Sequence, residues 1–300
     1  MTGPGSTKWA RGIRLRETTL GRLAEAYGGV VPHASAHSRV TRLSPPEAAA
    51  EGDLVPLLVP RLIANAAEAV ARGASLLVLA DVAKHPRARP LGGWVHPYAA
   101  WAMARVLEEW ALVSQEPSLL GRDVLLGANV ELGPRVLLGD RVTIGASSVI
   151  GGVGFGWAIG PDGHATRVPH LGGVVVEDDV TVGPLCTIDA GVLSPTIIRR
   201  GAHLDAQVHV AHNCEVGEGT FVAAQSGLAG SVKVGRGVLV GGQVGIADHV
   251  TVGDGARIAA KSGVIGDVPT GATVAGYPAV LHARWLRGLG ELYRSVKKRR

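Results

Sequence analysis

Three histidines lie within ten residues of one another in the second half of the sequence: His203, His209 and His212. An imidazole can accept a proton near neutral pH, because its usual pKa is about 6.5. Beside an exposed backbone N–H, such a base suits acyl transfer, in which it deprotonates the attacking group while the N–H holds the oxyanion. This chemistry needs no nucleophilic side chain. The alternative is a surface histidine hydrogen-bonded to the adjacent Asn213 or to Asp205.

The segment around these histidines has a six-residue period. An aliphatic residue, usually followed by a small or acidic one, recurs every six positions in three stretches. A fixed short period predicts strands joined by tight corners, three to a coil, so that residues three periods apart stack at about 4.8 Å. The pattern therefore predicts a parallel β-helix. The periodic residues are Leu126, Leu132, Leu138, Ile144 and Ile150, then Val176, Val182 and Ile188, and, after a slip of four residues at Ser194 and Pro195, Ile198, Leu204, Val210, Val216, Val222, Leu228, Val234, Val240, Ile246, Val252, Ile258 and Val264.

Counting rungs places three groups in one column on an outer edge of the coils. Gly230 follows His212 by 18 residues and is predicted one rung directly above the imidazole. His249 follows His212 by 37 residues, so it is expected about two rungs above and one residue further along. The column would combine a base, a glycine with a bare N–H and a second imidazole. His203 and His209 occupy a different position of the period from His212, which argues against a zinc site built from the three.

Both cysteines fall at the fifth position of the period, where small and β-branched residues predominate. Cys186 and Cys214 are therefore predicted to be packed thiols rather than nucleophiles or ligands. Two cysteines cannot form a disulfide framework, and no Cys/His cluster has the spacing of a structural zinc site, so no metal is expected. The sequence shows no secretory signal and no transmembrane segment, and we expect a cytoplasmic protein.

The composition is that of a folded globular chain, with 46% hydrophobic and 18% charged residues and 43 glycines in 300 residues. Residues 1–117 are predicted to form an α/β substrate-binding domain, 118–277 the β-helix, and 278–300 a basic C-terminal helix. The period is interrupted at 151–175, which we expect to leave the coils as an arm that reaches a neighbouring subunit or covers a site, or as a tolerated surface loop. The elements predicted in the first domain are a strand at 13–15, a helix from Thr18 or Thr19 to Gly28, a strand at 75–80 and a helix at 97–113.

The net charge of +5 is concentrated at the C-terminus, where Arg294 and residues 297–300 place five basic groups in the last seven residues. Such a tail is either a solvated helix end or a docking patch for an acidic partner. Nucleic acid is not the expected partner, because the sequence contains no recognised binding motif and no basic segment interleaved with aromatic residues.

Several segments resemble the UDP-3-O-acylglucosamine N-acyltransferases of lipid A biosynthesis. They are GAHLDAQVHVAHNCEVGEGT from Gly201, LAGSVKVG, GGQVGIADHVTVGDG, AGYPAVLHARWLR and the insertion GFGWAIGPDGHATRVPHLGG, and they span about residues 120–290. A weaker similarity to the first domain of that family lies in TLGRLAEAYGG and VHPYAAWAMARVLE. The HVAH run also resembles the sister enzymes that O-acylate UDP-N-acetylglucosamine, whereas AGYPAVLHARWLR favours the N-acyl family.

The resemblance implies a left-handed parallel β-helix that assembles as a homotrimer, with active sites between adjacent subunits. The implied donor is a 3-hydroxyacyl chain on acyl carrier protein, with no further cofactor. The resemblance also implies that His212 takes the proton from the sugar amine and that the N–H of Gly230 stabilises the tetrahedral intermediate. The implied substrate-binding residues are His249, Asp205, which matches an aspartate near the base, and His209.

The nucleotide-binding half departs from that family. The family's LTFL and NPKY segments, whose aromatic residues hold uracil, are replaced here by LVPL and VPRL, which bring in Pro56, Val59 and Leu62. Either another group such as Arg61 or Trp94 replaces the lost stacking, or the acceptor is not a uridine nucleotide sugar. Two further alternatives are an acetyl-coenzyme A-dependent sugar acetyltransferase and a non-catalytic β-helical trimer that binds a partner or a saccharide.

Overall fold

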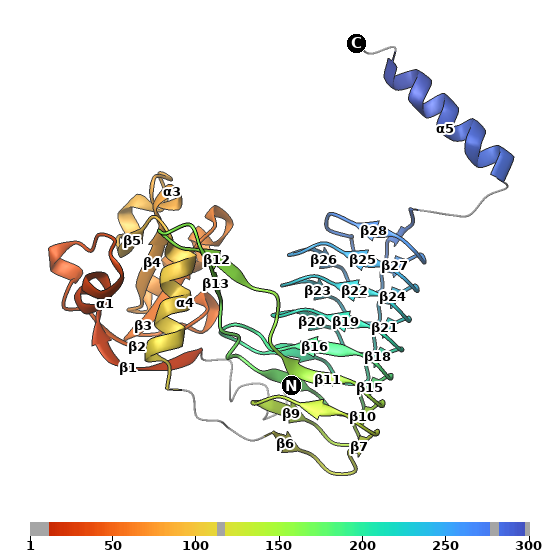
Figure 1. Ribbon diagram of the computed structural model, residues 1–300, viewed down its shortest axis with the longest axis horizontal. Helices are drawn as coiled ribbons and strands as arrows, with labels where there is room; N and C mark the ends of the chain where they lie inside the picture. Colours follow the sequence, from red (N-terminus) through yellow and green to blue (C-terminus); the bar gives the residue numbers. More distant parts are fainter. Residues whose placement is uncertain (1–11, 113–117, 277–281, 298–300) are drawn as a thin grey trace.

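The computed structural model describes residues 12–112, 118–276 and 282–297 of the chain. An α/β domain lies beside a long stack of coils, and one helix stands apart beyond the last coil (Figure 1). The predicted boundaries near residues 117 and 277 fall on residues outside the described ranges.

The N-terminal domain contains one sheet in the order β1-β2-β3-β4-β5, in which β1 and β2 are antiparallel and the other neighbours are parallel. Helix α1 begins after Thr19, whose hydroxyl accepts a hydrogen bond from the N–H of Arg22 at 3.4 Å. It ends at Gly28, where φ is 86°, a value that glycine adopts readily. The two strands and two helices predicted for this domain are confirmed as β1, β4, α1 and α4. The bounds are β1 Ile13–Thr19, β2 Arg39–Leu43, β3 Asp53–Leu57, β4 Ser75–Leu79 and β5 Trp94–His96, with helices α1 Leu20–Tyr27, α2 Ile63–Ala71, α3 Ala80–Ala83 and α4 Ala99–Trp110 and 3-10 turns at His33–Ser35, Pro46–Ala48, Pro60–Leu62 and Arg89–Leu91.

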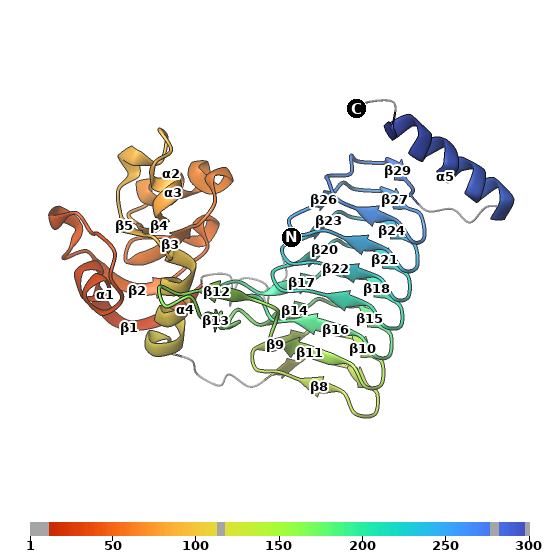
Figure 2. The ribbon, with the colours of Figure 1, turned by 45° about the horizontal axis from the view of Figure 1, so that its top comes forward.

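Three parallel sheets of very short strands form the β-helix, as the six-residue period predicts (Figure 2). His209 pairs with Gly227, and Gly227 pairs with Gly245, so neighbouring rungs lie 18 residues apart. The sheet orders are β29-β27-β24-β21-β18-β15-β10-β7, β28-β25-β22-β19-β16-β11-β8 and β26-β23-β20-β17-β14-β9-β6. The bounds are β6 Leu119–Leu120, β7 Leu125–Leu126, β8 Glu131–Leu132, β9 Val136–Leu138, β10 Thr143–Ile144, β11 Val149–Gly152, β14 Val174–Val176, β15 Thr181–Val182, β16 Thr187–Asp189, β17 Thr196–Ile198, β18 His203–Leu204, β19 His209–Val210, β20 Glu215–Val216, β21 Phe221–Val222, β22 Gly227–Leu228, β23 Lys233–Val234, β24 Leu239–Val240, β25 Gly245–Ile246, β26 Thr251–Val252, β27 Arg257–Ile258, β28 Gly263–Val264 and β29 Thr273–Val274.

The interior of the coils is a continuous aliphatic core made largely of the periodic residues, with both cysteines in it. Cys186 and Cys214 are 0% and 1% exposed, and burial raises the pKa of Cys214 to about 12. Both thiols therefore stay protonated and packed at neutral pH, as the period predicts.

Tight corners join the strands. Asn213, Ser231 and His249 occupy one such corner on three successive coils, each with φ near +60°.

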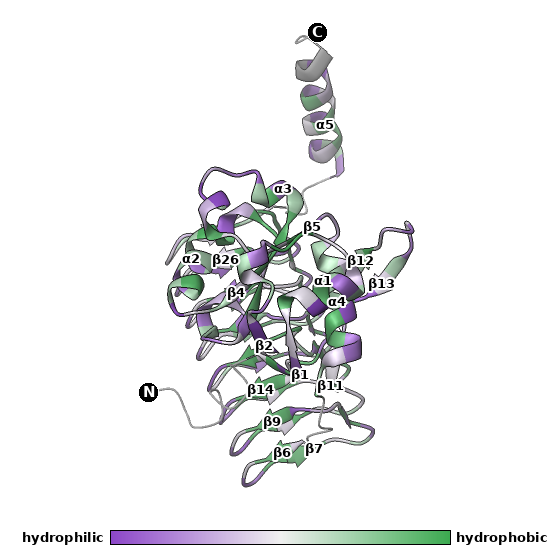
Figure 3. Cartoon of the chain, turned by 90° about the vertical axis from the view of Figure 1, so that its left-hand side faces the viewer, coloured by the Kyte–Doolittle hydropathy of each residue, from purple (hydrophilic) through white to green (hydrophobic). Residues whose placement is uncertain are grey.

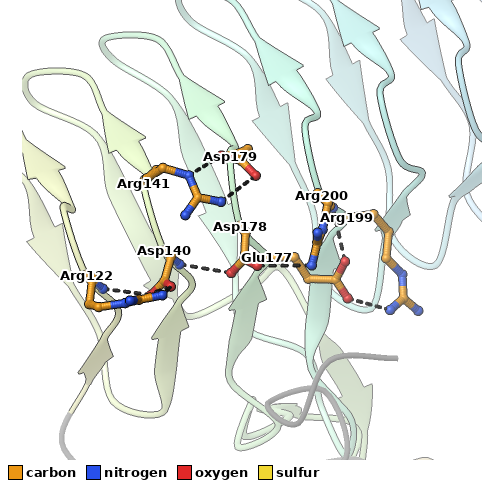
Figure 4. Close-up of polar contacts among 8 residues, drawn as sticks. All are labelled: Arg122, Asp140, Arg141, Glu177, Asp178, Asp179, Arg199 and Arg200. Atoms are coloured by element: carbon orange, nitrogen blue, oxygen red, sulfur yellow. Dashed lines mark hydrogen bonds and ion pairs between the residues drawn. The ribbon is translucent and has the colours of Figure 1, made fainter. Parts of the chain in front are cut away.

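Charged side chains cross the outer corners of the first coils (Figure 4). Each pair joins residues on different coils, so the ion pairs tie neighbouring rungs together. Most of these side chains are partly solvated, and exposed pairs of this kind stabilise by only about 0.2–1 kcal/mol each. The pairs are Arg122 with Asp140, Arg141 with Asp179, Arg200 with Asp178, and Arg199 with both Glu177 and Glu215.

The insertion at 151–175 folds back onto the N-terminal domain. Its antiparallel hairpin, β12 Trp157–Ile159 with β13 Ala165–Arg167, contacts α4, and β12 lies beside α4 in both Figures 1 and 2. Ala158 and Val168 are buried in the same hydrophobic cluster as Leu107 of that helix. The insertion therefore attaches the domain to the side of the coils. Its first residues also cover the His212 region, since a methyl group at Gly154 would lie 3.1 Å from Cδ2 of His212.

The last described element is the helix α5, His282–Lys297. Figure 3 shows it clear of both the N-terminal domain and the coils, with hydrophobic and hydrophilic residues along its length. Among the described residues, no helix combines the length and the apolar character needed to cross a bilayer.

Candidate active site

His212 lies at the corner between β19 and β20, with its ring half-buried. Nδ1 of the ring is 3.3 Å from Oδ1 of Asn213. The Asn213 amide is itself fixed, because its nitrogen donates to the carbonyl oxygen of Ser194 at 3.1 Å and its oxygen accepts from the N–H of Val192 at 3.1 Å. An amide oxygen can only accept, so Nδ1 carries the hydrogen in this bond. Nε2 of His212 is then left with its lone pair free to accept a proton.

Gly230 lies over the His212 ring, as the rung count predicts. A methyl group built on Gly230 would lie 2.6 Å from Cε1 and 2.8 Å from Nε2 of His212, so only glycine leaves room for the imidazole in this position. Hydrogen bonds from Ser231 N–H to the carbonyl oxygen of His212, and from His249 N–H to that of Gly230, fix the spacing of the rungs. Within the part of the chain that the structure describes, the N–H of Gly230 has no hydrogen-bond partner. A base with a free Nε2 therefore lies against a residue whose N–H is also free.

A groove of about 530 Å³ opens in front of this pair, and Phe155, Asp189 and His209 line it together with His212 and Gly230. Burial raises the pKa of Asp189, and the nearby imidazoles of His209 and His212 act against that shift. Oδ2 of Asp189 lies 3.9 Å from Nε2 of His209. The groove therefore holds a carboxyl group close to two imidazoles, an arrangement that stabilises positive charge on either ring.

Sequence reasoning missed Asp189, although a signal for it exists. Ile188 pairs with Val210, a separation of 22 residues, because the four-residue slip adds to the regular 18. Asp189 therefore lies one rung below Ala211, next to His212. Correcting the rung count for the slip would have found it.

His170 is a second missed residue, and it comes from the insertion. The residue is 7% exposed, and its ring lies 5.0 Å from the His212 ring, at an interplanar angle of 65°. Nδ1 donates to the carbonyl oxygen of Val168 at 2.8 Å, whereas Nε2 has no partner among the described residues. Burial lowers the pKa of His170 to about 4, so the ring is neutral near pH 7. No period relates this residue to the coils, and the sequence held no signal for the contact.

His249 faces a different groove from His212. It lies two rungs above Asn213, and it lines a cavity of about 740 Å³ between the N-terminal domain and the coils, together with Arg61, Leu62 and Lys233. Burial lowers the pKa of His249, and the positive charge of Arg61 lowers it further. The predicted column therefore divides, with His212 and Gly230 on one side of the corner and His249 on the other.

Two expectations are corrected. Asp205 lines a third groove with His203 and Phe221, and its carboxylate accepts from the N–H of Ala206 at 2.7 Å, so within the chain it does not lie beside His212. The reason is that a full corner separates the two residues around the coil.

Trp94 cannot stack on a base, because the residue is 0% exposed and its Nε1 donates to the carbonyl oxygen of Gly28. Unlike Asp205, His209 lines the same groove as His212. Among the described residues, no three His, Cys, Asp or Glu side chains are grouped so that they could hold a metal ion.

The fold and the repeats define the class of protein. Residues 117–152 and 195–230 match the model of the bacterial transferase hexapeptide (six repeats). The chain therefore contains hexapeptide repeats that are similar to those of bacterial transferases.

Comparison with known proteins narrows this class. The UDP-3-O-acylglucosamine N-acyltransferase of Myxococcus xanthus is 57% identical over 144 residues, which are 47% of this chain and 41% of that protein. The enzyme of the same name from Christiangramia forsetii is 49% identical over 76 residues, 25% of this chain and 22% of that protein. The chain is related to the UDP-3-O-acylglucosamine N-acyltransferases, and it spans less than half the length of these two relatives. A solved structure, UDP-N-acetylglucosamine acyltransferase from Campylobacter jejuni, is 24% identical, with 50% of this chain and 64% of that chain covered and a TM-score of 0.41.

Proposed function

We propose that the protein transfers a 3-hydroxyacyl group from acyl carrier protein to the amine of a 3-O-acylglucosamine-type acceptor, as a step of lipid A biosynthesis. One observation carries the proposal: the free Nε2 of His212 lies against Gly230, whose N–H is also free. A base and an adjacent oxyanion donor are the two groups that direct acyl transfer needs. The relatives named above support the identity of the acceptor.

The proposed reaction has three steps. The acceptor amine attacks the thioester carbonyl carbon, forming the C–N bond, and Nε2 of His212 takes the amine proton. The oxyanion of the tetrahedral intermediate accepts a hydrogen bond from the N–H of Gly230. When the intermediate collapses, the C–S bond breaks and the His212 imidazolium returns its proton to the leaving thiolate, with Asp189 close enough to stabilise the transient cation.

The second groove offers a place for the rest of the acceptor. Arg61 and Lys233 provide permanent positive charge there, with His249 beside them. Guanidinium and ammonium groups are suited to phosphate, so we assign a phosphate-bearing part of the acceptor to this groove. The proposal further includes a homotrimer in the cytoplasm, with acyl carrier protein as the donor's carrier.

Products identified by mass spectrometry test the proposed function. Purified protein is incubated with an amino-sugar acceptor panel and with matched thioesters of acyl carrier protein and of coenzyme A. We expect a mass increase of one 3-hydroxyacyl group on the amine, formed from the carrier-protein thioester. Acetyl transfer from coenzyme A would instead support a sugar acetyltransferase, and no product with any thioester would support a non-catalytic β-helix.

Calorimetric titration with UDP and UDP-N-acetylglucosamine tests the acceptor. Stacking of a base on an aromatic ring contributes about 1–3 kcal/mol, so replacing two rings by Pro56 and Leu62 would weaken uridine binding by roughly tenfold to several thousandfold without compensation. We expect Arg61 to compensate, giving a dissociation constant in the micromolar range. Arg61→Ala should then weaken binding by about tenfold or more, since a hydrogen bond to a charged group contributes about 1.5–3 kcal/mol.

Arg22→Ala is the matched control, because Arg22 is an exposed arginine on α1 outside this groove. No detectable heat at millimolar ligand would exclude a uridine acceptor and indicate a changed sugar.

A further inference from the structure

His170 carries a buried ring nitrogen without a hydrogen-bond partner among the described residues. This atom is Nε2, whereas Nδ1 of the same ring donates to the carbonyl oxygen of Val168 at 2.8 Å. A buried polar atom without a partner costs free energy, and native proteins keep few of them. Such an atom beside a candidate active site indicates a function for the ring that carries it.

Two glycines of the insertion bring this nitrogen against the ring of His212. A methyl group on Gly154 would lie 2.7 Å from Nε2 of His170 and 3.1 Å from Cδ2 of His212. One on Gly156 would lie 2.8 Å from Cε1 of His170. The absence of both side chains therefore lets the insertion close around His170. At Gly154, no side chain comes between Nε2 and the Cδ2 edge of His212.

The two rings have different tasks for a proton. The carbonyl oxygen of Val168 can only accept, so the hydrogen of His170 is on Nδ1, and burial keeps this ring neutral by lowering its pKa to about 4. A positive charge on His212 acts in the same direction, because two neighbouring cations repel each other. His170 therefore stays neutral when His212 accepts a proton. Its unprotonated Nε2, the negative end of the ring dipole, then lies beside the new positive charge.

We propose that His170 is a positioning residue for the His212 base. Its ring fixes the orientation of His212, and its unprotonated Nε2 stabilises the imidazolium that forms when the acceptor amine loses its proton. Asn213 holds the opposite edge of His212, with Oδ1 at 3.3 Å from Nδ1, so the base is oriented from two sides. This role rests on the proposed acyl transfer and adds a residue of the insertion to it.

Other charged and titratable groups also face the two rings. Asp189 on β16 and His209 on β19 line the same groove as the base, and His249 interacts with the base from across the corner. The charge of Arg167, on β13, further disfavours a proton on the buried ring. Substitutions at residue 170 leave all four groups in place. A change in the pH dependence of such variants therefore reports the contact between the two rings.

A matched pair of variants tests this role. Met and Gln have similar length and flexibility, so His170→Met and His170→Gln disturb the packing alike, but only Gln places an acceptor oxygen beside His212. With the carrier-protein thioester we expect His170→Met to lower kcat by about tenfold and to keep KM within about twofold, because the orientation and the stabilisation of the base are both lost. His170→Gln should stay within about threefold of the wild-type kcat, because it keeps an acceptor. His164→Met is the control, because His164 is an exposed histidine of the same insertion.

The pH dependence separates this role from packing. His212 acts as a base in its neutral form, and without a group that stabilises the imidazolium it is protonated only at lower pH. The acid limb of the pH–rate profile should therefore move to lower pH in His170→Met, by about one unit for a tenfold effect, and return in His170→Gln. Titration of the His212 ring followed by NMR without substrate should move in the same direction. Gly154→Ala keeps His170 but forces the rings apart, and it should shift both measurements as His170→Met does.

Two results would overturn the role. Equal rates for the Met and Gln variants would assign residue 170 to packing alone. An acid limb and a ring titration that stay at the wild-type pH in His170→Met and Gly154→Ala would exclude an electrostatic contact. Thermal unfolding identifies a Met variant that has lost its fold, and Gly154→Ala then carries the comparison. If the wild type transfers no acyl group from any thioester, the proposed function fails, whereas the NMR titration still decides whether His170 acts on His212.

Discussion

His212→Ala is expected to lower turnover by roughly two to four orders of magnitude, the usual cost of losing a general base. The acceptor amine would then have no group to take its proton as the C–N bond forms. The fold should survive, because the ring is half-buried on the outer edge of a coil and the corner is fixed by Asn213, whose N–H donates to Oγ1 of Thr196 at 2.9 Å. Single-turnover kinetics with the carrier-protein thioester measures the chemical step directly.

His203→Ala is the matched control for this variant. His203 stacks on Phe221 in a separate groove, so its removal should leave the rate close to that of the wild type. Circular dichroism and thermal unfolding confirm that both variants are folded. A His212→Ala protein with a near-normal rate would end the assignment of His212 as the base.

Gly230→Ala is expected to reduce turnover by about a hundredfold, the loss that follows when a reacting group is displaced by about 1 Å. The new methyl group would lie 2.6 Å from Cε1 of His212, closer than real contacts allow, so the imidazole must move away. The backbone N–H remains in this variant. The loss would therefore report the displacement of the base and not the removal of the donor.

Gly263→Ala provides the comparison, because a methyl group at Gly263 meets nothing within 4 Å and the residue lies on a coil beyond the groove. We expect the two variants to unfold at similar temperatures and to differ in turnover. Should Gly230→Ala keep full activity, the stacking of Gly230 on His212 would have no role in the reaction.

The β-helix was predictable because its repeat is local. Each coil obtains its contacts from residues 18 positions away, so a six-residue alternation of aliphatic and small side chains encodes both the strands and their register. The same local rule placed Gly230 above His212 and both cysteines in the core. Helix α1 was predictable for a similar reason, since Thr19 and Gly28 act on the turns next to them.

The other elements of the first domain carry weaker local signals. Strand β3 contains Pro56, which lacks an N–H for a ladder, and β5 is only three residues long. Both are held as strands by their neighbours on the sheet and by burial, as the 0% exposure of Val55 and Trp94 shows. Contacts between distant segments therefore override local preference there.

The surroundings of His212 depend on such distant contacts. His170 reaches the base only because the insertion packs on α4 and returns to the coils, and no spacing along the chain encodes the fit of one surface to another. The six-residue period also does not specify which side of a corner a side chain faces. For this reason His249 was expected beside His212, whereas it lies in the groove of Arg61. A repeat specifies which residues stack along its axis, whereas the neighbours across a groove are chosen by the packing of whole elements.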